Sequence, residues 1–237
     1  MIGTRRVLAT IPARGGSKRF PGKNLALLEG RSLLAYSVEA AFGCEAVDRV
    51  VVSTEDDAIN RAAQECGAEV INRPPDLATD DAELGPVCRH ALLEAENRDQ
   101  CCYDVHVLLQ PTSPLRTSEH INLGLQLLDD SECDSILSVR SCSEDPYVAR
   151  VVKDGVLHPF LPITDSDLQH KQDLPRVYYP NGALYITYRS VLLRTHHVLG
   201  SRTVPLLMTI EDSVDIDREF DMSVANLMLR RRLESNL

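Results

Sequence analysis

Short apolar runs rich in β-branched residues alternate with helical patterns along the first 140 residues of this chain. The runs are too short for ordinary helices and are bounded by proline, glycine or polar residues, so we expect buried strands. Between them, apolar residues recur at helical spacing, as in Leu33–Phe42, where Ser32 is a suitable N-cap. This alternation predicts an α/β fold with a doubly wound, mainly parallel sheet and right-handed crossovers. The predicted strands are Val7–Ile11, Arg49–Ser53, Glu69–Asn72, Asp104–Gln110 and Ser135–Val139, and the predicted helices cover residues 33–42, 54–66, 83–97 and 118–129.

The pattern changes between Ser141 and Pro180, where proline and polar residues become frequent and only short extended pieces occur, such as Tyr147–Val152. A stretch of about 40 residues is too small to fold alone, so we expect an excursion from the sheet that packs on a partner. Strands at Ala183–Tyr188 and Thr203–Met208, a short helix from Ser190 and a helix over 218–233 return to the sheet. The predicted division is a core of residues 1–140, an excursion of residues 141–180 and a return to the core over residues 181–237.

Composition excludes several classes of protein. The chain has 237 residues, of which 43% are hydrophobic and 25% charged, which is typical of a globular domain with a sizeable core. Its net charge of −10 argues against a nucleic-acid-binding surface. The first apolar run is broken by Pro12 and Arg14, too early for a signal peptide or membrane span, so we expect a cytoplasmic protein. Seven cysteines without a CxxC pair are expected to be thiols rather than disulfides or zinc ligands.

The loop after the first predicted strand, Ile11–Asn24, opposes the acidic balance of the chain. Glycines space its basic residues and would let backbone N–H groups approach an anion, while lysine and arginine supply charge. The loop is not a Walker A motif, because Ser17 and Asn24 stand where that motif needs glycine and a hydroxyl residue. A solvated loop with chance basic residues is the alternative, but ligands of parallel sheets collect at strand carboxyl ends, which favours a polyphosphate site. The four basic residues are Arg14, Lys18, Arg19 and Lys23.

The segment Glu211–Asp217 is an acidic counterpart near the other end of the chain. If it is extended, Asp215 and Asp217 point to the same side while Ile216 faces the core. Two carboxylates form an incomplete oxygen cage that suits Mg²⁺, since this ion takes further ligands from water and substrate phosphates. The alternative is that Asp217 caps a helix. If both segments lie at one sheet edge, a nucleoside triphosphate could bridge them, which indicates metal-assisted phosphoryl or nucleotidyl transfer.

Two polar turns add weaker candidates. The predicted strand ending at Gln110 runs into a rigid turn with two prolines, and Tyr179–Gly182 forms a polar turn before a strand. Ordinary turn chemistry explains these residues about as well as a site does. No serine–histidine–acid or cysteine–histidine arrangement is apparent. The candidate substrate contacts at the strand end are Gln110, Thr112, Ser113 and Arg116.

Five motifs together resemble one family. They are IPARGGSKRFPGKN, INRPPDLATD, LLQPTSPLR, KQDLPRVYYPNGALYI and SVDIDREFD, and in this order they are similar to the acylneuraminate cytidylyltransferases, the CMP-sialic acid synthetases and their relatives. The resemblance implies a Rossmann-like nucleotidyltransferase fold and a homodimer built by the 141–180 excursion. It also implies Mg²⁺-dependent attack of the anomeric hydroxyl of a nine-carbon keto sugar acid on the α-phosphate of CTP, with release of pyrophosphate.

The resemblance also implies roles for individual residues. Arg14, Lys23 and Asp215 are expected to be catalytic, with Asp215 and Asp217 as the metal ligands. The expected nucleotide contacts are Arg14, Lys18, Lys23, Asn24, Arg73 near the cytosine, and Asn181. The expected sugar contacts are Gln110, Asn181 and, lent to the neighbouring subunit, Lys171 and Gln172, beside the strand-end candidates Thr112 and Ser113 named above.

Two departures from the family pattern concern the sugar and the base. Lys171 stands where relatives often carry arginine, which replaces a planar fork with a point charge. Leu84 stands where some relatives carry a small polar residue near the base. The choice among neuraminic, legionaminic and pseudaminic acids therefore stays open. Two alternatives also remain: a CMP-Kdo synthetase acting on an eight-carbon acid, and a nucleotide-binding regulatory module without turnover.

Overall fold

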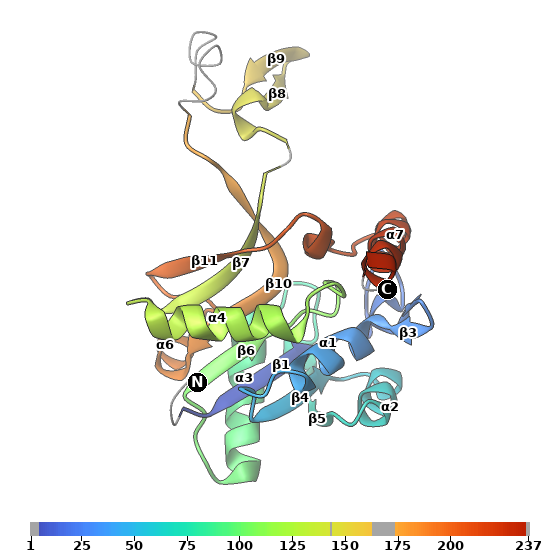
Figure 1. The fold of residues 1–237 in the computed structure, drawn as a ribbon, viewed down its shortest axis with the longest axis vertical. Coiled ribbons are helices and arrows are strands. Elements are labelled where there is room, and N and C mark those ends of the chain that lie inside the picture. The colour runs from blue at the N-terminus through green and yellow to red at the C-terminus, as the bar shows by residue number, and fades with distance from the viewer. Residues whose placement is uncertain (1–4, 143, 163–173, 236–237) are drawn as a thin grey trace.

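The computed structural model describes residues 5–142, 144–162 and 174–235, which form a central seven-stranded sheet with helices on both faces (Figure 1). Among these residues no helix has the length and apolar character needed to cross a bilayer. The strands are β1 (Val7–Pro12), β2 (Leu27–Leu28), β3 (Arg31–Ser32), β4 (Arg49–Thr54), β5 (Glu69–Asn72), β6 (Val105–Leu108), β7 (Ser135–Ser141), β8 (Arg150–Lys153), β9 (Val156–Pro159), β10 (Tyr178–Tyr188) and β11 (Thr203–Leu207). The α-helices are α1 (Leu33–Phe42), α2 (Asp57–Glu65), α3 (Leu84–Asp99), α4 (Ser118–Asp130), α6 (Arg189–Thr195) and α7 (Glu219–Ser235). Short 3₁₀ turns are η1 (Lys23–Leu25), η2 (Pro75–Leu77), η3 (Pro146–Val148) and η5 (Glu211–Ser213).

The strand order of the central sheet is β11-β7-β10-β6-β1-β4-β5. Neighbouring strands are parallel except at β10, which runs antiparallel to both β6 and β7. The prediction of a doubly wound, mainly parallel α/β sheet is therefore confirmed. The antiparallel direction of β10 follows from its connection, because the chain returns to the sheet from the excursion rather than through a crossover helix.

The side chains of β1 point alternately to the two faces of the central sheet, and this explains why helices cover both faces. Val7, Ala9 and Ile11 pack in one core with α1, α2 and α4, whereas Leu8 packs in a second core with α3 and α6. Successive strand residues point to opposite faces, so a strand that is apolar throughout requires two covered faces. The predicted helices at 33–42, 54–66, 83–97 and 118–129 correspond to α1–α4 within a few residues, and Ser32 accepts a hydrogen bond from the Ala35 N–H as the predicted N-cap.

The excursion leaves the sheet along β7 and returns along β10 (Figure 1). Its described part contains η3 and the β8–β9 hairpin, which lies away from the sheet. The strand predicted at Ala183–Tyr188 begins five residues earlier, at Tyr178, because Tyr178–Pro180 pair with the outer end of β7. The pairing register shifts between Pro180 and Tyr185, where Gly182 takes a positive φ of 73°. This β-bulge places a kink beside the end of β6.

The start of α3 packs closely against the end of α6, and this contact predicts a sensitive position. A Cβ at Gly85 would lie 1.8 Å from the carbonyl oxygen of His196, a backbone atom that cannot rotate away. We therefore expect Gly85→Ala to lower the free energy of unfolding by about 1–3 kcal/mol. In a chain of this size that loss lowers Tm by several degrees in a thermal unfolding experiment. Gly16→Ala is the control, since no atom lies within 4 Å of a Cβ there, and equal Tm values for both variants would contradict the packing argument.

Candidate active site

The carboxyl ends of β1, β5 and β6 lie at one edge of the sheet, and the segments that follow them enclose a cleft of about 250 Å³. The basic loop after β1, the segment from Arg73 to Val87 and the turn from Gln110 to Thr112 supply its walls. A second hollow of about 310 Å³ shares Arg14, Ser17, Lys23 and Asp80 with the first, and extends it to Asp217. One continuous cavity therefore runs from the sheet edge to the acidic segment.

Close contacts fix the backbone of the basic loop. The Gly15 N–H donates to Glu55 Oε1 at 2.8 Å, and a Cβ at Gly15 would lie 2.4 Å from Asp56 Oδ2. A side chain at position 15 would therefore require the Asp56 side chain to move. The Asn24 side chain donates to the Arg14 carbonyl at 2.9 Å across the loop. These bonds hold the loop in shape, so that its cations face the cavity.

Lys23 and Asp217 join the two ends of the chain. Lys23 Nζ lies 2.9 Å from Asp217 Oδ1, and Arg19 Nη1 lies 3.2 Å from Oδ2 of the same carboxylate. The Lys23 side chain is only 13% exposed, whereas Arg19 is 74% exposed. The hydrogen bond from Lys23 lowers the pKa of Asp217. The Asp217 carboxylate faces the cations, and the backbone N–H of Asp217 donates to the Asp221 carboxylate. The alternative that the Asp217 carboxylate caps α7 is therefore not supported.

Asp80 pairs with the remaining two cations of the loop. Arg14 Nη2 lies 3.0 Å from its carboxylate, and Lys18 Nζ contacts the other oxygen. A hydrogen bond from Lys18 is the main cause that lowers the pKa of Asp80. This residue was missed in the sequence, although it lies in the motif INRPPDLATD that also contains Arg73. The feature that could have indicated Asp80 is the acidic pair Asp80-Asp81, because it ends a motif that already belonged to the predicted site.

Asp215 lines neither hollow; it lies next to Gly182 of the bulge and interacts with Thr112, Asp217 and Lys23. Desolvation by the surrounding protein raises its pKa, and the charge of Asp217 raises it further, while the neighbouring Thr112 hydroxyl and Lys23 act in the opposite direction. The Ile216 side chain is fully buried and its N–H donates to the Thr112 carbonyl at 2.8 Å. The predicted arrangement of two acids flanking a core isoleucine is therefore present.

The donor set around Asp215 fits a hard divalent cation. Asp215 and Asp217 present oxygen ligands whose mutual repulsion a cation would relieve, and the Thr112 hydroxyl interacts with Asp215 beside them. No group of three or more histidine, cysteine, aspartate or glutamate side chains that could hold a metal occurs within the described ranges. The pair is thus an open site, which needs further oxygen ligands from a substrate or from water.

The floor of the cleft contains a buried guanidinium. Arg73 is 7% exposed and donates to the Ser53 carbonyl oxygen at 2.5 Å and to the Ser53 hydroxyl at 3.2 Å. Burial lowers the pKa of Arg73. Apolar side chains of Leu77, Leu84 and Val87 line the same end of the cleft. This end can therefore receive a flat, partly apolar group, while the opposite end attracts anions.

Comparison with known proteins identifies the family. Residues 8–198 match the family model described as cytidylyltransferase. The chain belongs to the cytidylyltransferase family. It is 33% identical over 223 residues to the N-acylneuraminate cytidylyltransferase of Escherichia coli O18:K1:H7, covering 93% of this chain and 51% of that protein. It is also 33% identical over 232 residues to the CMP-N,N'-diacetyllegionaminic acid synthase of Legionella pneumophila, covering 97% of this chain and 99% of that one.

The chain differs in length from one of these relatives and matches the other, and its fold is found among solved structures. The chain spans about half the length of the E. coli relative but nearly all of the Legionella one. Among solved structures it resembles a CMP:2-keto-3-deoxy-manno-octonic acid synthetase complexed with CTP, with a TM-score of 0.68 and 20% identity over 96% of this chain and 99% of that one. At that identity the likeness shows the fold alone. The family resemblance predicted from the five motifs is thus confirmed.

The structure brings most, but not all, of the predicted site residues of this cytidylyltransferase to the cavity. Arg14, Lys18, Lys23, Asn24, Arg73, Gln110, Thr112 and Asp217 line it, whereas Asp215 does not line it but interacts with Thr112 and Lys23 that do. Lys171 and Gln172 lie outside the described residues. Ser113 is fully buried, with its hydroxyl 3.5 Å from the Asn181 carbonyl, so it sits behind the cavity wall.

Asn181 also lies behind the wall. It is 3% exposed, and its side-chain oxygen accepts from the Ser138 hydroxyl at 2.6 Å and the Ala183 N–H at 3.1 Å. Its amide nitrogen donates to Ser213 Oγ at 2.9 Å and to the sulfur of Met208. With these partners Asn181 closes the bulge and anchors η5, and in this conformation it offers no free group to a ligand.

The opposite pKa shifts of the two acids predict opposite stability effects. The raised pKa of Asp215 means that its charge opposes folding at pH 7, a cost that disappears as the pH falls toward its ordinary value of 3.8. The lowered pKa of Asp217 means that its charge favours folding above 3.8. In a chelating buffer at pH 7 we therefore expect Asp215→Asn to raise Tm and Asp217→Asn to lower it. Both differences should shrink on acidification, and shifts of the same sign would contradict the assignment.

Proposed function

We propose that this cytidylyltransferase transfers CMP from CTP to the anomeric hydroxyl of a sialic acid-like, nine-carbon keto sugar acid and releases pyrophosphate. One observation carries the proposal: the basic loop and the acidic segment, almost 200 residues apart in sequence, meet in one cavity, with Lys23 Nζ 2.9 Å from Asp217 Oδ1. A triphosphate requires the cations and a divalent metal requires the acids, so the pairing suits metal-assisted nucleotidyl transfer.

The cavity suggests how CTP would lie. The cytosine fits the end with Arg73 and the apolar side chains, and the phosphates fit the basic loop. Phosphate oxygens would replace Asp80 as the partner of Arg14 and Lys18. Lysine and arginine would then neutralise charge that develops on the leaving pyrophosphate, and that interaction is stronger in the transition state than in the bound substrate.

Asp215 and Asp217 would hold Mg²⁺ in this scheme. The ion would supply Lewis-acid polarisation of the phosphates. Lys23, which is largely buried and in contact with Asp217, would keep the two acids and the phosphate end of the cavity in register. Gln110 and Thr112 lie at the cavity where the sugar hydroxyl must approach the α-phosphate.

The substrate class rests on the curated relatives. The names of the E. coli and Legionella relatives, both 33% identical to this chain, refer to N-acylneuraminate and N,N'-diacetyllegionaminic acid. The CMP:2-keto-3-deoxy-manno-octonic acid synthetase shares the fold at 20% identity. A nonulosonic acid is therefore favoured over an eight-carbon acid. A cytoplasmic location is also proposed, in keeping with seven free thiols, since disulfides are rare in that compartment.

Apolar exposure on the excursion supports the proposal of a homodimer. Val152 and Leu157 face each other across the β8–β9 hairpin and are 70% and 67% exposed, and Phe160 next to the hairpin is 62% exposed. Large apolar side chains gathered on a small projecting element are typical of an interface. We propose that a second copy of this chain covers them and that Lys171 and Gln172 reach the partner's sugar pocket.

Turnover tests the proposed reaction directly. We expect pyrophosphate release from CTP and Mg²⁺ with one member of a panel of nonulosonic acids, and loss of activity on chelation. Lys23→Ala and Asp215→Ala should each lower kcat by about 100-fold or more, because each removes a charge that faces the reacting phosphates.

The other outcomes of this assay separate the alternatives. Turnover with Kdo alone would identify an eight-carbon substrate. Nucleotide binding without pyrophosphate release across the whole panel would indicate a regulatory module. Arg230→Met is a useful control, since Arg230 pairs with Glu29 on the surface and should leave kcat unchanged.

The dimer proposal predicts the effect of charges on the hairpin. Val152→Asp combined with Leu157→Asp should convert a dimer into a monomer in size-exclusion chromatography with light scattering, because burial of carboxylates in an apolar interface is unfavourable. Leu123→Asp, at an exposed apolar position on α4, is the control and should leave the dimer intact. A monomeric wild-type protein would refute the dimer, and a monomeric variant with full activity would refute the shared sugar pocket.

A further inference from the structure

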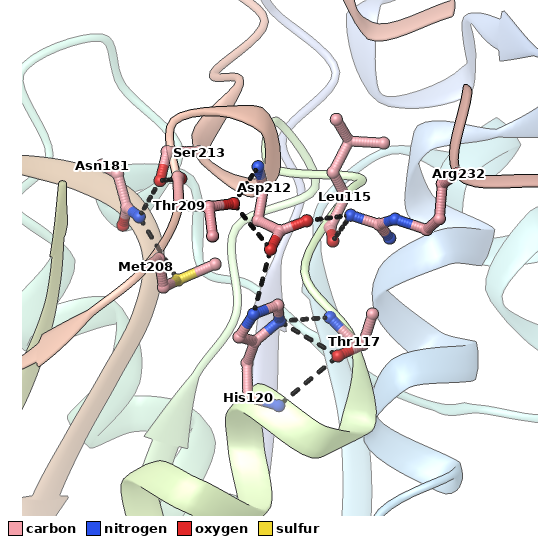
Figure 2. Close-up of polar contacts among 9 residues, drawn as sticks. All are labelled: Leu115, Thr117, His120, Asn181, Met208, Thr209, Asp212, Ser213 and Arg232. Carbon is pink, nitrogen blue, oxygen red and sulfur yellow. Dashed lines mark hydrogen bonds and ion pairs between the residues drawn. The ribbon is translucent and has the colours of Figure 1, made fainter. Parts of the chain in front are cut away.

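Three charged or titratable side chains outside the cavity meet behind the acidic segment (Figure 2). They are His120 from the first turn of α4, Asp212 from η5 and Arg232 from the last turns of α7. None of them lines the cleft or the hollow that extends it. Their sequence separation is large, so their contacts fix how these three elements lie relative to one another.

Asp212 is the centre of this cluster. Its Oδ2 accepts from the Thr209 hydroxyl at 2.8 Å and lies 3.5 Å from His120 Nε2, while Oδ1 contacts Arg232 Nη2. The Asp212 N–H also donates to the Thr209 hydroxyl at 3.1 Å. Both carboxylate oxygens are thus used, and the 3₁₀ turn that contains Asp212 is closed on itself and tied to two helices.

His120 has its tautomer set by the helix cap. The Thr117 N–H donates to His120 Nδ1 at 3.1 Å, in a capping box in which histidine replaces the usual glutamate or glutamine. A ring nitrogen that accepts a hydrogen bond cannot carry the proton, so Nε2 carries it and points toward Asp212 (Figure 2). Burial lowers the pKa of His120, which agrees with a neutral ring.

Arg232 connects the acidic segment to the turn that follows β6. Its Nη2 donates to the Leu115 carbonyl at 3.0 Å and contacts Asp212 (Figure 2). Leu115 belongs to the turn whose Thr112 carbonyl accepts from the Ile216 N–H, between the two acids. On the opposite side of the same 3₁₀ turn, Ser213 accepts from Asn181. The acidic segment is therefore clamped to the Pro111–Thr117 turn at both ends.

We propose that His120, Asp212 and Arg232 are positioning residues that hold Asp215 and Asp217 in place and thereby set the affinity of the site for a divalent cation. The inference rests on the proposed function, in which these two acids bind the metal. The three residues act through the backbone of residues 209–217 and touch neither the nucleotide nor the sugar. Their loss should weaken metal use while leaving the chemistry at saturating metal largely intact.

Mg²⁺ titrations of the whole 237-residue chain test this inference. Asp212→Asn and Arg232→Met should raise the Mg²⁺ concentration for half-maximal rate, and for half-maximal CTP binding by calorimetry, about ten-fold. The kcat at saturating Mg²⁺ should stay within about two-fold of wild type, because lost outer contacts act through ligand placement. His120→Gln, which can keep the helix cap, should give a smaller rise.

Hydrogen exchange supplies a readout that needs no CTP, metal or turnover. Amides of residues 209–217 should exchange faster in Asp212→Asn and Arg232→Met, while those of the central sheet should not change. Arg230→Met, on the same helix but paired with Glu29, should behave as wild type in every measurement.

The inference is overturned by either of two results. One is unchanged exchange over residues 209–217 in the variants, and the other is faster exchange throughout the protein together with unchanged Mg²⁺ dependence, which would indicate a merely structural cluster. A wild-type enzyme without turnover would instead contradict the proposed function, and the exchange result would still decide whether the cluster positions the segment.

Discussion

The contact between Lys23 and Asp217 is the interaction on which the architecture of the site depends. It joins the first loop of the sheet to the segment before the last helix, and a largely buried lysine makes it. The contact alone would be weak, but Ile216 next to it is fully buried in a small core with Leu28, Leu33 and Ala225. Apolar burial therefore brings the acidic segment to the basic loop, and the ion pair selects its exact orientation.

The other ion pairs of the cavity are of a different kind. Lys18 and Arg19 are 82% and 74% exposed, and pairs between exposed side chains contribute about 0–1 kcal/mol. In the proposed function, Asp80 and Asp217 can thus give up these partners to phosphate oxygens at little cost. A chain with a net charge of −10 can in this way keep a concentrated set of cations near an anion site without strong local repulsion.

How far the sequence predicts this molecule depends on whether a feature is local. The sheet strands and the α-helices of the first 140 residues follow from periodicity and caps, whereas the short strands β2 and β3 were not predicted. The two acids flanking Ile216 follow from spacing. The antiparallel direction of β10 and its start at Tyr178 depend on long-range pairing with β7, which no local pattern encodes. Asn181 illustrates the limit for the site, because its residue type suits a ligand contact, but its neighbours Ser138, Ala183 and Ser213 use its hydrogen-bonding groups.

Several groups that oppose folding gather around the same place. Arg116 is 2% exposed and burial lowers its pKa to about 9, yet its partners are the carbonyls of Gln110 and Ala183 and the Ser37 hydroxyl rather than a carboxylate. Its guanidinium donates to the Ala183 carbonyl within the bulge of β10. The desolvated Asp215 adds to this set. Unfavourable groups of this kind persist only where the surrounding structure holds them in place. Here the contacts that hold them also fix the turn after β6 and the bulge in β10, which form two rigid walls. Rigid walls on both sides leave the acidic segment, the proposed metal site, as the part whose position the remaining contacts must determine.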